Sequence, residues 1–219
     1  GNSVIWNPAY PWGDALWRPP AFDEMIVYEL HLGTFSGQGD GLTGHPAGFR
    51  DMVDTHLNHL VELGINTVEL MPLTEFADDL SWGYNPSFQF APESIYGSPD
   101  DLKYLVDRCH RAGLAVIVYV VFNHMGASDL SGNLLNYDGT EIYFYPTGNS
   151  FRDTPWGPRP DYGRREIREY ITDCVRMWIE EYPVDGFRLD GTAFIKVNTD
   201  GWRVMQDIAH AVDTVSPRA

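Results

Sequence analysis

Two charged side chains end an apolar segment near residue 190, in the order Gly186-Phe-Arg-Leu-Asp190. Arg188 and Asp190 are two residues apart, so on an extended strand their side chains lie on the same face. An arginine beside an aspartate favours the ionised carboxylate at neutral pH. That ionised form is the one that acts as a nucleophile. A plain salt bridge at a strand end has the same spacing, so the spacing alone leaves both interpretations open.

Two other segments carry groups that suit a polar ring. Asn123 and His124 follow the apolar run 115–122, where they either hydrogen-bond a substrate or cap the strand. Trp82 and Tyr84 flank a glycine in an earlier loop. A sugar ring has apolar faces and polar edges, so it fits an aromatic face beside hydrogen-bonding groups. The alternative is that both rings only pack their own loop.

Four apolar runs alternate with amphipathic segments along the chain. Each run predicts a buried strand, and the runs cover residues 25–32, 65–71, 115–122 and 184–190. Apolar residues spaced three and four apart predict helices at 49–61, 99–112, 167–182 and 201–215. Alternating strands and helices indicate an α/β fold with a parallel sheet.

Two architectures fit this order: a doubly wound open sheet and part of a β/α barrel. Both place ligand sites at the carboxyl ends of the strands, where long loops follow strands two and three. A full barrel has eight units in about 250 residues. The four units in 219 residues therefore predict half of a (β/α)8 TIM barrel over 25–219. An irregular lead-in is expected over 1–24. The aromatic side chains of the long loop at 123–162 either line a groove or form a small core of their own, and the core is the favoured interpretation.

Amino-acid composition and net charge exclude several classes of protein and of partner. The chain is 43% hydrophobic and 14% aromatic, which predicts a folded domain. Its net charge of −16 makes nucleic acid a poor partner. No apolar run approaches the ~20 residues of a membrane helix, so no membrane association is predicted. The two cysteines, Cys109 and Cys174, are expected to be buried free thiols. The first residues lack a signal-peptide pattern, and a cytoplasmic location is expected.

Together these segments resemble the α-amylase clan, glycoside hydrolase family 13. Three motifs match in order: Trp82-Gly-Tyr84, the Asn123-His124 strand end, and Gly186-Phe-Arg-Leu-Asp190. The finer match is to 1,4-α-glucan branching enzymes and maltooligosyltrehalose trehalohydrolase-like members. The segments that carry this finer match are Tyr28-Glu-Leu-His-Leu-Gly-Thr-Phe35, Phe90-Ala-Pro-Glu-Ser94, Tyr96-Gly-Ser-Pro-Asp-Asp-Leu102 and Asp185-Gly-Phe-Arg-Leu-Asp-Gly-Thr192.

The resemblance implies a retaining enzyme that acts on an α-1,4-glucan of the starch or glycogen type. In that reading Asp190 is the nucleophile that forms a glycosyl-enzyme intermediate, and Arg188 keeps it ionised. His124 bonds the sugar next to the cleaved bond. These three residues are the predicted catalytic set.

The resemblance also implies substrate-binding positions. Tyr84 would stack on the same sugar ring, with Trp82, Asn123 and Tyr119 nearby. Asn123 is a calcium ligand in many amylases of the clan, but branching-type members generally lack that ion. Neither a metal nor a cofactor is therefore expected.

Two departures from the family pattern leave the activity open. The family's general acid follows strand five and its third carboxylate follows strand seven, and neither segment occurs in this sequence. Retaining hydrolysis needs two carboxyl groups about 5–5.5 Å apart, of which Asp190 is one. Tyr119 stands where the family has an aspartate, and a phenol carries no negative charge at neutral pH.

Three hypotheses follow from these departures. In the first, two copies of the chain pair as a homodimer that covers the open half-barrel, and another chain supplies the acid from Glu69, Glu75 or Asp79. In the second, the chain is a catalytically inert fragment. In the third, it is a glucan-binding protein that lacks the general acid. Hydrolysis and transglycosylation are equally compatible with the sequence.

Overall fold

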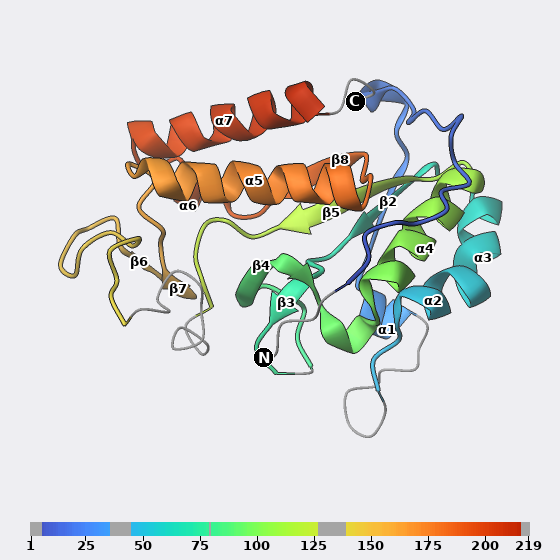
Figure 1. The fold of residues 1–219 in the computed structure, drawn as a ribbon, viewed down its shortest axis with the longest axis horizontal. Helices are drawn as coiled ribbons and strands as arrows, with labels where there is room; N and C mark the ends of the chain where they lie inside the picture. The colour runs from blue at the N-terminus through green and yellow to red at the C-terminus, as the bar shows by residue number, and fades with distance from the viewer. Residues whose placement is uncertain (1–5, 36–44, 79, 127–138, 216–219) are drawn as a thin grey trace.

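The centre of the computed structural model is a four-stranded parallel sheet, and the structure describes residues 6–35, 45–78, 80–126 and 139–215 (Figure 1). The strands are β1 (Val27–Leu30), β2 (Thr67–Leu70), β5 (Ala115–Val120) and β8 (Gly186–Leu189). Their order in the sheet is their order in the chain. A doubly wound sheet reverses its strand order at a switch point, whereas a barrel does not. The predicted parallel α/β fold is thus confirmed, with barrel-type order.

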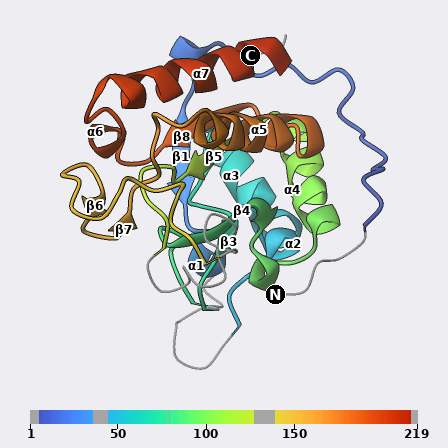
Figure 2. The ribbon, with the colours of Figure 1, turned by 60° about the vertical axis from the view of Figure 1, so that its left-hand side comes forward.

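Helices follow each strand. β1 leads to α2 (Phe49–Asp51), a π-helical turn over Met52–His56, and α3 (Leu57–Glu62). β2 leads to α4 (Pro99–Arg111), and β5 leads to α5 (Arg165–Glu181). After β8 come a short α6 (Thr192–Ile195) and α7 (Thr199–Val215). Figures 1 and 2 show α7 lying alongside α5, so these two helices form one layer over the sheet.

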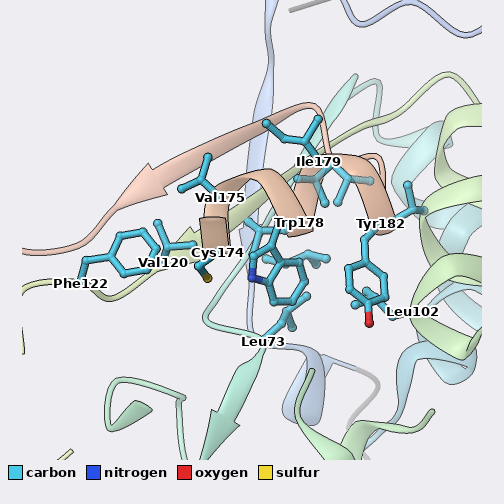
Figure 3. Packing of buried hydrophobic residues seen from close by; sticks show 14 of the residues in the cluster. Leu73, Leu102, Val120, Phe122, Cys174, Val175, Trp178, Ile179 and Tyr182 are labelled. Carbon is cyan, nitrogen blue, oxygen red and sulfur yellow. The ribbon is translucent and has the colours of Figure 1, made fainter. Parts of the chain in front are cut away.

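The core lies between the sheet and these helices. Trp178 of α5 is fully buried, and Figure 3 shows it among apolar side chains that include Val120, Leu73 and Tyr182. Burying an aromatic side chain of this size is worth roughly 3 kcal/mol or more, at about 25 cal/mol per Å² of apolar surface. Cys109 and Cys174 are buried free thiols, as predicted. The opposite face of the sheet carries polar side chains such as Arg188.

The structure corrects the end of the first strand and adds elements to the loops. β1 ends at Leu30, and residues Leu32–Phe35 form a helical turn, α1, instead of continuing the strand. The loop after β2 contains an antiparallel hairpin, β3 (Thr74–Phe76) with β4 (Pro86–Pro92). The prolines occupy the two ends of β4, where a missing N–H costs the ladder little. A small hairpin of β6 (Asp153–Thr154) and β7 (Gly157–Pro158) lies in the next long loop.

The lead-in is irregular up to a 3₁₀ turn over Phe22–Glu24, η1. Its attachment to α4 is polar and centres on His110. The His110 ring lies between two carboxylates, with Nδ1 2.6 Å from Asp14 Oδ2 and Nε2 2.9 Å from Asp185 Oδ2. Trp17 stacks on the ring at 4.8 Å and donates to Asp185 Oδ1. The division into a lead-in over 1–24 and a half-barrel over 25–219 stays a prediction.

Two opposing effects set the pKa of His110. Burial alone lowers the pKa of the imidazole, but the hydrogen bonds and charges of Asp185 and Asp14 outweigh it and raise the pKa above its ordinary value. A raised folded-state pKa stabilises the fold fully below the unfolded value of about 6.5. That stabilisation is lost as the pH rises through the folded-state pKa.

Asp14→Asn removes one of the two carboxylates that face His110. We expect it to lower the free energy of unfolding by about 1–3 kcal/mol near pH 6 and by less near pH 9, measured by urea denaturation. The control is Asp23→Asn, the same charge change on an exposed residue of the lead-in. Equal losses at both pH values for Asp14→Asn would contradict a role for protonated His110.

Candidate active site

Asp190 is fixed at the carboxyl end of the sheet by Asn123. The β5–β8 register pairs Tyr119 with Arg188 and Val120 with Leu189, so the residues just beyond both strands come together. Asn123 Nδ2 donates to Asp190 Oδ2 at 2.7 Å and to its main-chain oxygen at 3.1 Å. The sequence predicted a ligand site at the carboxyl ends of the strands, and the structure brings these two residues together there.

Tyr119 reaches the other carboxylate oxygen. Its hydroxyl donates to Asp190 Oδ1 at 3.4 Å, and its ring meets Tyr84 edge to face at 5.4 Å. Burial, followed by the hydrogen bond and charge of Tyr119, raises the pKa of Tyr84 well above its usual value, so that Tyr84 remains a neutral phenol. Asp190 thus accepts from the Tyr119 hydroxyl at Oδ1 and from the Asn123 amide at Oδ2. The Tyr119 side chain is buried and supports the carboxylate, rather than presenting an open surface.

Arg188 does not form the ion pair expected from its spacing with Asp190. Among the residues that the structure describes, its ion pair is with Glu69, with Arg188 Nη1 3.2 Å from Glu69 Oε1. Its guanidinium also lies over the Tyr119 ring, 4.9 Å from the ring centroid. The physical reason is the register, which sets Tyr119 directly beside Arg188. Burial raises the pKa of Glu69, and the charge of Arg188 offsets only part of that effect.

His124 is buried, and both of its ring nitrogens face acceptors within the protein. Nε2 is 2.8 Å from the main-chain oxygen of Tyr84, and Nδ1 is 2.5 Å from Asn123 Oδ1. Burial lowers the pKa of His124, although the Tyr84 carbonyl and Asp190 oppose this. In this structure the imidazole orients Asn123, which in turn holds Asp190. A neutral imidazole donates to only one of these two acceptors, and the direct bond from His124 to a sugar stays a prediction.

Two tryptophans belong to the loops that carry Tyr84 and follow β5. Trp82 is 67% exposed, as a sugar-stacking side chain would be. Trp156, in the turn between β6 and β7, has its ring centroid 5.6 Å from that of His124 and 4.9 Å from that of Phe194, and it is 50% exposed. The sequence favoured the core of the loop for Trp156 over a groove lining, and the structure places the ring beside His124 instead. The signal available was a bulky ring followed by glycine in a turn.

The predicted loop core is formed by other aromatic residues. Phe144, Tyr145 and Tyr162 are buried, and Tyr162 donates to the main-chain oxygen of Phe122 at 2.9 Å. These contacts fasten the long loop to the end of β5. The loop is therefore anchored by its own aromatic side chains while Trp156 remains partly exposed beside His124.

The three carboxylates considered as a second acid are found in different surroundings. Glu69 is paired with Arg188, and Glu75 accepts bonds from the Ser94 backbone N–H and hydroxyl. Asp79 lies outside the described residues. Within the described residues no group of three or more His, Cys, Asp or Glu side chains is arranged to hold a metal ion. In the same residues, no helix is both long and apolar enough to cross a bilayer.

Comparison with known proteins defines the class to which this fold and site correspond. Residues 37–134 match the family described as alpha amylase, catalytic domain. The chain is 34% identical over 215 residues to the malto-oligosyltrehalose trehalohydrolase of Saccharolobus solfataricus, covering 97% of this chain and 35% of that protein. It is 37% identical over 199 residues to the 1,4-alpha-glucan branching enzyme GlgB of Bacillus caldolyticus, covering 87% of this chain and 29% of the enzyme.

Solved structures agree with this class. One from Salmonella typhimurium superposes with a TM-score of 0.81 at 32% identity, covering 96% of this chain and 33% of that one. A pullulanase from Paenibacillus barengoltzii gives a TM-score of 0.76 at 24% identity, which supports the fold alone. The chain thus spans about a third of the length of these relatives. The resemblance to the α-amylase family is confirmed, and the chain is similar to part of a trehalohydrolase and of branching enzymes.

Gly83 positions Tyr84 through a backbone that other residues adopt poorly. Its φ is +86°, and a Cβ there would lie 2.5 Å from the Pro72 carbonyl oxygen. We expect Gly83→Ala to cost about 1 kcal/mol for the positive φ and a further ~1–3 kcal/mol for the clash, measured by chemical denaturation. Gly113→Ala is the control, because its φ is +83° and nothing lies within 4 Å of the new Cβ. Equal losses in the two variants would show that the contact with Pro72 is unimportant.

Proposed function

We propose that this chain forms the part of an α-glucan-active glycoside hydrolase or glucanotransferase that carries the catalytic nucleophile, Asp190. The observation that supports this most strongly is the pair of hydrogen bonds from Asn123 to Asp190. The bond to the main-chain oxygen fixes Asp190 at the strand end, and the bond to the side chain occupies Oδ2. Among the described residues, the one hydrogen bond to Oδ1 is the long contact from Tyr119, and Oδ1 is the oxygen available for attack.

The proposed chemistry is double displacement. Asp190 Oδ1 attacks the anomeric carbon, and the bond from that carbon to the leaving glucan oxygen breaks. A second carboxylic acid protonates the leaving oxygen, and then, as a base, activates water or a sugar hydroxyl to cleave the ester. Water gives hydrolysis and a sugar hydroxyl gives transfer. The Asn123 amide holds Oδ2 throughout, which keeps the carboxylate plane fixed.

The proposed substrate is a neutral α-glucan. A chain of net charge −16 repels polyanions but not an uncharged polysaccharide. Trp156 offers an exposed ring beside His124, Trp82 is exposed two residues before Tyr84, and the Tyr84 ring meets Tyr119 edge to face. Aromatic faces of this kind stack on the apolar faces of glucose rings.

A second candidate function is glucan binding without turnover. The ion pair of Arg188 with Glu69 favours it, because that pair directs the guanidinium away from the nucleophile. The homodimer that would cover the open face of the sheet, and the cytoplasmic location, remain predictions. Turnover and binding need separate tests.

Nucleophilicity of Asp190 can be tested with 5-fluoro-α-D-glucosyl fluoride. Fluoride is a good leaving group, so formation of the covalent intermediate does not require the second carboxylic acid. We expect the purified chain to gain one fluoroglucosyl unit by intact-mass spectrometry, with the adduct mapped to Asp190.

Asp190→Asn is expected to abolish this labelling. Asp153→Asn is the matched control, because its side chain is 90% exposed and lies outside the cluster. An unlabelled wild-type chain would argue against Asp190 as a nucleophile in this protein. An adduct that persists in Asp190→Asn would assign the reaction to another residue.

Glucan binding can be tested at Trp156. We expect Trp156→Ala to weaken maltoheptaose binding about tenfold in calorimetry, which corresponds to ~1.4 kcal/mol of stacking. Trp202→Ala is the control, since Trp202 is similarly exposed at 54% but lies on α7. Equal weakening by both substitutions would mean that binding does not involve the Asp190 cluster.

A further inference from the structure

A second feature outside the proposed catalytic centre is a basic groove between α5 and α7. It has a volume of about 380 Å³ and is lined by four arginines, Arg165, Arg168, Arg176 and Arg203, together with His210. Figures 1 and 2 show the two helices side by side in the layer that covers the sheet. The groove is therefore built on rigid elements.

The charge of this groove is opposite to that of the whole molecule. The chain has 15 Lys and Arg against 31 Asp and Glu, yet four of the 15 line this one groove. Glu169 and Asp207 are the acidic side chains in its lining. The lining therefore carries four positive side chains against two negative ones, which favours an anion as its ligand.

The arginines of the groove already form ion pairs with nearby carboxylates, and an anionic ligand would have to compete with these pairs. Arg165 pairs with Glu169 at 2.7 Å, but both side chains are more than half exposed. Ion pairs at exposed positions contribute about 0–1 kcal/mol. Arg168 pairs with Asp207 at 3.2 Å and also donates to the main-chain oxygens of Tyr162 and Gly163. Arg176 pairs with Asp173 at 3.1 Å, again between exposed side chains. In the described part of the chain Arg203 forms no ion pair, so one guanidinium in the lining has no compensating carboxylate.

We propose that this groove binds the phosphate group of a small sugar phosphate. A guanidinium presents paired N–H donors that match phosphate oxygens, and a dianion accepts from several of them at once. The volume falls within the usual range of about 300–1,000 Å³ for small-ligand sites. A nucleic acid is disfavoured because the rest of the chain repels an extended polyanion.

Calorimetry with glucose 6-phosphate tests this proposal on the chain itself. We expect binding of glucose 6-phosphate, weaker binding of inorganic phosphate, and none of glucose. The double variant Arg165→Ala/Arg203→Ala should lose at least tenfold in affinity, and added salt should weaken wild-type binding. Arg18→Ala is the control, because Arg18 is an exposed arginine of the lead-in. Arg203→Gln alone replaces the double variant if circular dichroism shows that the double variant is unfolded.

Several outcomes would overturn the proposal. They are no heat of binding up to about 10 mM ligand, equal binding of glucose, or the same loss of affinity in Arg18→Ala and the groove variants. None of these measurements requires catalysis. The result is therefore separate from the labelling of Asp190, and failure of one proposal leaves the other standing.

Discussion

The parallel register between β5 and β8 determines which side chains meet at the carboxyl edge of the sheet. Because successive side chains on a strand point to opposite faces, a shift of one residue would exchange the two faces of a strand. The buried side chains Val116 and Val118 hold β5 in place against the helices. The positions of Tyr119 and Arg188 beside each other, and the contact of Asn123 with Asp190, follow from this packing.

That register also explains the electrostatics of the open face. On this face Glu69 of β2 and Arg188 of β8 lie on either side of β5, and they form the ion pair. Tyr119 lies beside Arg188 and under its guanidinium, and it contributes a hydroxyl rather than a second charge. The carboxylate of Asp190 is consequently held by neutral donors, Asn123 and Tyr119. The positive charge of Arg188 pairs with Glu69 instead of with Asp190.

Sequence patterns predict the parts of this arrangement that depend on local spacing. The apolar runs locate the four strands of the parallel sheet, because buried parallel strands need continuous apolar residues. The strand ends locate Asn123 and Asp190 because parallel strands bring their carboxyl ends to one edge. The partner of Arg188 depends on a residue 119 positions away, and no local pattern carries that information. The same holds for Trp156, whose place over His124 is set by the path of a long loop.

Short strands such as β8, with four residues, make few ladder bonds, so side-chain bonds at their ends contribute much to their position. Asp185 accepts from the Val116 N–H at 2.8 Å just before β8, and its own N–H donates to the Val116 carbonyl. Beyond the carboxyl end of β8, the Asp190 N–H donates to the Val120 carbonyl, and the Asn123 amide donates to the main-chain oxygen of Asp190. Asp185 is also the carboxylate that His110 and the lead-in hold. The lead-in and Asp190 are thus connected through β8. Buried polar contacts of the lead-in and His110 hold Asp185 before the strand, and Asn123 holds Asp190 after it.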